Sequence, residues 1–160
     1  MKKTKTIVAL MLTAAALLGL AVGAPAQHNH GGTAGAGMKM DTREVLVEGV
    51  AVTFQIMANA EHAKHLKGMK MKEEVEPGTT HNVTVILKDL ATGKEINDAT
   101  VNMKVVDPKG GDQIKTLKHE SEMNSFDAYF NMPSKGKYQL LVLFKTGEKK
   151  RTAGIHYELK

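Results

Sequence analysis

Two histidines and two methionines cluster near the middle of the chain, in the pattern His62-x-x-His65-x-x-x-Met69-x-Met71. The chain has no cysteine, but it has seven histidines and ten methionines. Imidazole nitrogen and thioether sulfur are therefore its main donors for soft or borderline metal ions, copper above all. A loop with two imidazoles and two thioethers supplies the two to four ligands that Cu(I) accepts, so the cluster predicts a copper site.

Two alternatives to copper follow from the same residues. Zinc is disfavoured because thioether is a poor zinc ligand and the chain lacks cysteine. In the other alternative no metal binds: Met69 and Met71 pack into a core, and His62 and His65 are solvated loop residues. Burial of the methionines away from the histidines would favour this second alternative.

A second set of donors lies near the N-terminus, at His28, His30, Met38 and Met40. Beside a free α-amino group at Gln27, these side chains would chelate copper ions, with Met38 and Met40 as soft ligands. The alternative is a spacer with incidental histidines. Three other histidines are weaker candidates, namely His81 at the start of a strand, His119 near Met123 in an acidic connection, and His156, which we expect to face solvent.

The first 26 residues have the pattern of a secretory signal. Three lysines precede an apolar run from Ile7 to Val22, and Ala24-Pro25-Ala26 supplies the small residues expected before cleavage. The alternative is an uncleaved membrane anchor, since the apolar run is almost long enough to span a bilayer. We expect cleavage, export to the bacterial periplasm or beyond, and no stable membrane insertion afterwards.

Charge and motifs exclude several function classes. The chain carries +5, and loss of the three signal lysines would leave 19 Lys+Arg against 17 Asp+Glu, a net charge of +2. Such a balanced surface, without tryptophan, argues against nucleic-acid binding. The sequence has no G-x-S-x-G elbow, P-loop, dinucleotide fingerprint or His-Glu-x-x-His. We therefore expect a binding or interaction module and not an enzyme.

The elements that would position these residues are mostly strands. Residues 27–44 are glycine-rich with few large apolar side chains, which predicts a flexible tail before a domain at 45–160. Within that domain, apolar residues alternate with period two in seven short segments, which predicts an antiparallel β-sandwich. The segments are Val50–Ile56, Val83–Leu87, Val101–Val105, Ile114–Leu117, Phe126–Phe130, Tyr138–Phe144 and Ile155–Leu159.

The long connection from Asn59 to Glu76 interrupts this pattern. Its first half, from Ala60 to Leu66, predicts one or two helical turns, with Gly68 as a stop. His62 and His65 would then share a face, because residues three apart are neighbours on a helix. Met69 and Met71 would follow in an extended stretch, where a spacing of two again places side chains on one face.

Two segments of the sandwich resemble a known family. The run from His81 to Asp89, then Thr92-Gly93-Lys94-Glu95-Ile96-Asn97-Asp98-Ala99-Thr100-Val101, together with Gly136-Lys137-Tyr138-Gln139-Leu140-Leu141-Val142, resembles the YtkA/FixH-like group of secreted immunoglobulin-like domains. That group is close in architecture to copper-resistance sandwich proteins. The resemblance covers roughly residues 45 to 159 and implies an immunoglobulin-like fold. The family's Met-Pro-x-Met-Gly segment is replaced here by Asp107-Pro108-Lys109-Gly110-Gly111, which has no methionine.

Together these observations predict a periplasmic or secreted carrier that binds copper through His and Met side chains. It would exchange the ion with an envelope protein. The alternative is an interaction or accessory module of the cell envelope without a metal site.

Overall fold

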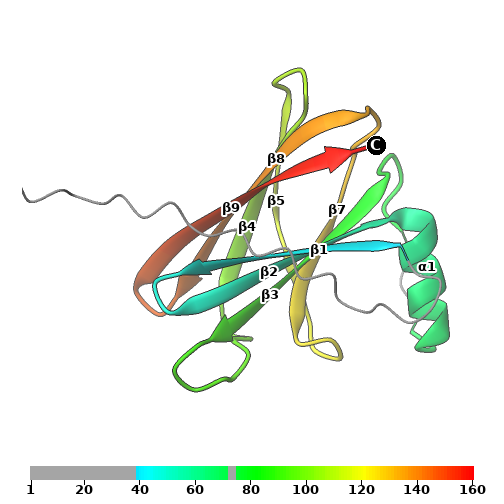
Figure 1. Cartoon of the computed structure of the whole chain (residues 1–160). Helices are drawn as coiled ribbons and strands as arrows, with labels where there is room; N and C mark the ends of the chain where they lie inside the picture. Colours follow the sequence, from blue (N-terminus) through cyan, green and yellow to red (C-terminus); the bar gives the residue numbers. More distant parts are fainter. Residues whose placement is uncertain (1–38, 72–74) are drawn as a thin grey trace, which may run out of the picture.

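The computed structural model describes residues 39–71 and 75–160, which form two packed antiparallel sheets (Figure 1). A five-stranded sheet has the order β1-β2-β3-β7-β6, and a four-stranded sheet has the order β5-β4-β8-β9. The elements are β1 Met40–Val47, β2 Val50–Ala58, α1 Asn59–Gly68, β3 His81–Asp89, β4 Thr100–Val106, β5 Asp112–Thr116, β6 Lys118–Glu120, β7 Ser125–Phe130, β8 Gly136–Thr146 and β9 Lys149–Leu159.

This architecture confirms the predicted immunoglobulin-like sandwich. The inward residues of the strands are those with period-two spacing, and most are fully buried. Each buried aliphatic or aromatic side chain contributes about 1.5–3 kcal/mol relative to exposure. Met103 and Met132 belong to this core, so neither is a candidate ligand at the surface.

The sheet begins earlier than the sequence indicated. Residues 40–44, predicted to belong to the tail, form the first half of β1 and pair in register with β2. The two strands are joined at Glu48 and Gly49, which have φ values of 44° and 80°. Positive φ at both positions is the geometry of a type I′ hairpin turn, whose twist matches that of its strands. β1 therefore begins five residues before the predicted domain start at 45.

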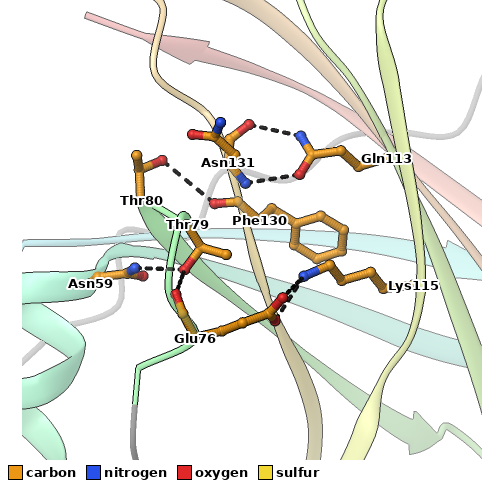
Figure 2. Close-up of polar contacts among 8 residues, drawn as sticks. All are labelled: Asn59, Glu76, Thr79, Thr80, Gln113, Lys115, Phe130 and Asn131. Carbon is orange, nitrogen blue, oxygen red and sulfur yellow. Dashed lines mark hydrogen bonds and ion pairs between the residues drawn. The ribbon is translucent and has the colours of Figure 1, made fainter.

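The segment between β2 and β3, which contains α1, is joined at its two ends by hydrogen bonds. The Asn59 backbone N–H donates to the Thr80 carbonyl at 2.9 Å. Asn59 Nδ2 donates to Thr79 Oγ1 at 3.0 Å (Figure 2). Further along, Lys115 Nζ lies 2.7 Å from both carboxylate oxygens of Glu76. The chain thus leaves and re-enters the five-stranded sheet at one point, and an ion pair links it to β5 of the other sheet.

On the same side of the sandwich, a second group of contacts links the two sheets. The Gln113 side chain pairs with the backbone of Asn131, donating to its carbonyl at 2.7 Å and accepting from its N–H at 2.9 Å (Figure 2). Lys115 Nζ also lies 5.7 Å from the centroid of the Phe130 ring. These contacts tie β5 to the end of β7. Among the described residues, no helix is long and apolar enough to cross a membrane.

Candidate metal centre

The helix expected between the first two predicted strands is present as α1. Its interior is rich in Ala, Glu, Lys and Leu, which are strong helix formers. Glu61 lies in the first turn and bonds Lys64 Nζ at 2.8 Å, whereas His65 and Lys67 lie in the last turn. This charge order complements the helix dipole. The buried side of the helix is formed by His62 and Leu66.

His62 anchors α1 to the outer face of the five-stranded sheet. It is only 2% exposed, and its Nδ1 lies 3.0 Å from the hydroxyl of Tyr129 on β7. The two rings meet edge to face with centroids 5.5 Å apart. Burial, with a smaller contribution from the charge of His65, lowers the pKa of His62 from 6.5 to about 4. At neutral pH this ring is uncharged and fills a packed site.

The C-terminal end of α1 differs from the sequence prediction. Lys70 has φ of 60°, its N–H donates to Lys67 O at 3.1 Å, and the Met71 N–H donates to Leu66 O at 2.9 Å. This bond pair is a Schellman motif, in which the chain folds back over the last helical turn. α1 ends at Gly68, as predicted, but the residue with a left-handed backbone is Lys70 and not the glycine. The expectation that Met69 and Met71 lie in an extended stretch was therefore wrong.

Three of the four predicted ligands belong to the C-terminal end of α1 along the backbone: His65 in the last turn, Met69 at the C-cap, and Met71 two residues later. Met69 follows His65 by four residues and is 40% exposed, while His65 and Met71 are partly exposed. The last carbonyls of a helix carry partial negative charge, which favours a cation there. We call His65, Met69 and Met71 the cap cluster. Its donors are one imidazole and two thioethers, a set suited to Cu(I).

The structure also places one predicted tail ligand close to this end of the sheet. Met40 pairs with Met57 in the β1–β2 register, so their side chains share the outer face of the sheet. Met57 in turn aligns with Asn82, and Asn82 with Tyr129, the partner of His62. The row beneath α1 therefore contains two methionines. Met57 and Tyr129 were not predicted as site residues, because period two only assigned them to a sheet face.

The remaining candidates are dispersed. His28, His30 and Met38 lie outside the described residues. His156 is exposed on β9, as expected. The His119 ring lies against Phe126 with ring centroids 5.0 Å apart and an angle of 52° between the ring planes. Within residues 39–71 and 75–160, no three His, Cys, Asp or Glu side chains gather as metal ligands.

No protein-family model and no curated protein sequence matches the chain. Three solved structures are similar in fold. FetP from a uropathogenic Escherichia coli strain, recombinantly expressed in the periplasm, aligns with a TM-score of 0.57 at 11% identity, over 77% of this chain and 97% of FetP. A copper-bound variant of FetP aligns with a TM-score of 0.56 at 10% identity, over 76% and 97%.

The third structure is a DUF4426 family protein from Pseudomonas aeruginosa, with a TM-score of 0.54 at 14% identity, over 74% of this chain and 94% of that protein. At such identities the likeness establishes the β-sandwich fold alone. Membership of the YtkA/FixH-like group stays a prediction.

Proposed function

We propose that this protein is a periplasmic or secreted copper carrier, and not an enzyme, which holds the ion at the cap cluster. The observation that supports this proposal best is the Schellman turn, which folds Met71 back over the last turn of α1, where His65 and Met69 lie. The helix end contributes partial negative charge without a carboxylate. A copper-bound protein of similar fold also supports a copper role.

The donor set is better suited to Cu(I) than to harder ions. Soft thioether sulfur selects Cu(I), whereas Zn²⁺ prefers thiolate, imidazole and carboxylate, and Mg²⁺ and Ca²⁺ prefer oxygen. His65 and Met69 are accessible at the surface, so an incoming donor can replace them one at a time. This accessibility favours a carrier that passes the ion to an envelope protein.

His62 has a different role in this proposal from the one the sequence indicated. Its buried ring and its bond to Tyr129 hold α1 against the sheet and thereby position the cap cluster. Residues that orient metal ligands typically change affinity about 10–100-fold when replaced. The donors His28, His30 and Met38 precede Met40, which lies at the α1 end of the sheet, so we propose that they capture ions for the cap cluster.

A competitive Cu(I) titration against a chromogenic chelator tests the proposal. The protein is expressed with its own N-terminal segment and recovered from the periplasm. We expect one cap-cluster ion bound well below micromolar. The triple variant His65→Gln/Met69→Leu/Met71→Leu should weaken this binding by more than about a hundredfold, beyond the usual effect of an orienting residue.

The matched control is His156→Gln with Met123→Leu, which removes one imidazole and one thioether elsewhere on the domain. The control should bind as the wild type does. Unchanged affinity in the triple variant would disprove the cap cluster, and no copper binding by the wild type would disprove the carrier function.

One feature favours the alternative interaction function. Ile114 is 67% exposed and Leu143 is 42% exposed on the four-stranded sheet, and Leu141 is partly exposed. Ile114 and Leu141 both pair with Lys104, so they flank it on the outer face. If the titration shows no metal binding, this face is the surface to mutate in a partner search.

A further inference from the structure

A cavity of about 650 Å³ lies at the α1 end of the sandwich, between β1 and β9. These strands belong to different sheets, and each forms an edge of its own sheet. The cavity is lined from inward-facing strand positions by Asp41, Arg43, Ile56, Ala58, His81 and Tyr157. A cavity of this volume has room for a small organic ligand.

Two charged side chains of β1 point into the space between the sheets. Asp41 pairs with Ile56 and Arg43 pairs with Phe54, and residues directly opposite each other share a face of the sheet. Ile56 and Phe54 both belong to the hydrophobic core. Arg43 Nη1 lies 3.6 Å from Asp41 Oδ1. A negative and a positive charge therefore lie next to each other on a face that is otherwise apolar.

Tyr157 borders the same space from the opposite sheet. Its side chain is buried and belongs to the core on β9. Burial, followed by the negative charge of Asp41 and a hydrogen bond with it, raises the pKa of Tyr157. The Asp41 carboxylate therefore lies close to both the Arg43 guanidinium and a phenolic hydroxyl.

His81 forms a further part of the wall, two strands away from β1. It is 9% exposed, and burial lowers its pKa, so the ring is neutral at pH 7. Its Nδ1 lies 2.8 Å from Thr80 Oγ1, which leaves Nε2 as the nitrogen available to a ligand. Ala58, its register partner on β2, is exposed. The small Ala58 side chain leaves space between β1 and β3, whose axes are about 10 Å apart at two strand spacings.

The neighbouring charges of opposite sign distinguish between classes of ligand. Partly buried charges are costly unless each has a partner. A ligand with only a carboxylate would compete with Asp41 for Arg43 and leave Asp41 without its counter-charge. A zwitterion supplies a partner to both, because its carboxylate matches the planar guanidinium and its ammonium donates to carboxylate and hydroxyl oxygens.

We propose that this cavity binds a small zwitterion of the amino-acid type. The ligand carboxylate binds Arg43, its ammonium binds Asp41, and its side chain extends over Ile56 and Ala58 toward His81. The inference does not rest on the copper proposal, because none of these residues belongs to the cap cluster. It gives the protein an organic ligand in addition to a metal ion.

An NMR titration of the metal-free protein with three probes of matched apolar chain tests this proposal. The probes are L-leucine, 4-methylpentanoate, which lacks the ammonium, and 3-methylbutylamine, which lacks the carboxylate. We expect L-leucine to shift the His81 ring resonances saturably and to leave those of His119, on the far edge strand β6, unchanged. Each single-charge probe should bind at least about tenfold more weakly, because it lacks one contact between charged groups.

Asp41→Asn and Arg43→Gln test the two contacts separately. Asp41→Asn should abolish the preference for L-leucine over 4-methylpentanoate, and Arg43→Gln should abolish the preference over 3-methylbutylamine. The matched control is Lys104→Gln/Asp112→Asn, which removes an ion pair on the four-stranded sheet away from the cavity and should bind as the wild type does.

Two results with the wild type alone would overturn the proposal, whether or not the variants fold. These are an L-leucine titration that does not shift the His81 ring, and equal binding of the three probes. Preferences that persist in both variants would also overturn it. Each of these results leaves the cap cluster unaffected, because the titration is done without metal.

Discussion

The buried His62 predicts a specific acid sensitivity of the metal-free protein. Its pKa is about 4 in the folded state against 6.5 in an unfolded chain. As pH falls below 6.5, the unfolded state takes up a proton that the folded state does not. The stabilisation by neutral His62 is therefore complete above pH 6.5 and is lost as pH falls toward 4.

The magnitude follows from the two pKa values. A difference of about 2.5 units at about 1.36 kcal/mol per unit corresponds to about 3 kcal/mol lost by pH 4, most of it already by pH 4.5. Other groups also titrate in this range, among them His81, whose pKa is lowered by burial. The useful quantity is therefore the difference between the wild type and His62→Asn, in which the amide takes the place of Nδ1 opposite Tyr129.

The assay is urea unfolding followed by far-ultraviolet circular dichroism, at pH 7.5 and at pH 4.5, with a metal chelator present. We expect the wild type to lose about 2–3 kcal/mol more than His62→Asn between these pH values, by the linkage above. Equal losses in the two proteins would show that His62 is not held neutral by burial. They would refute the anchoring role given to it here.

Three further substitutions test the local reasoning. Lys70 has a left-handed backbone, which costs a non-glycine residue free energy, so Lys70→Gly should raise the free energy of unfolding in urea by about 1 kcal/mol. A loss of stability would contradict the Schellman geometry. Asn82→Ala removes a buried donor 2.6 Å from Asp127 Oδ2 and should lower the melting temperature, with a loss of about 1–3 kcal/mol. Lys115→Met breaks the partly exposed ion pair with Glu76 and should lower the free energy of unfolding by less than about 1 kcal/mol, an effect that added salt should erase.

Much of the sandwich was predictable because its signal is local. Alternating apolar residues in segments such as Val83–Leu87 can bury one face only as strands, and burial at 0–2% follows that pattern. Residues 40–44 were not predicted as part of a strand, because this segment carries several charged residues and forms the edge of its sheet. Its pairing depends on the hairpin turn at Glu48 and Gly49 more than on hydrophobic alternation.

For the candidate site, the sequence by itself determined which donors exist and that a short helix carries two of them. It did not determine which histidine is buried, because His62 and His65 are close to equivalent on an isolated helix. Contact with Tyr129, 67 residues away, buries His62 and leaves His65 accessible. Long-range strand register likewise places Met40 beside Met57 on the outer face of the five-stranded sheet. Such pairings depend on contacts between distant segments, which a local pattern of residue types does not encode.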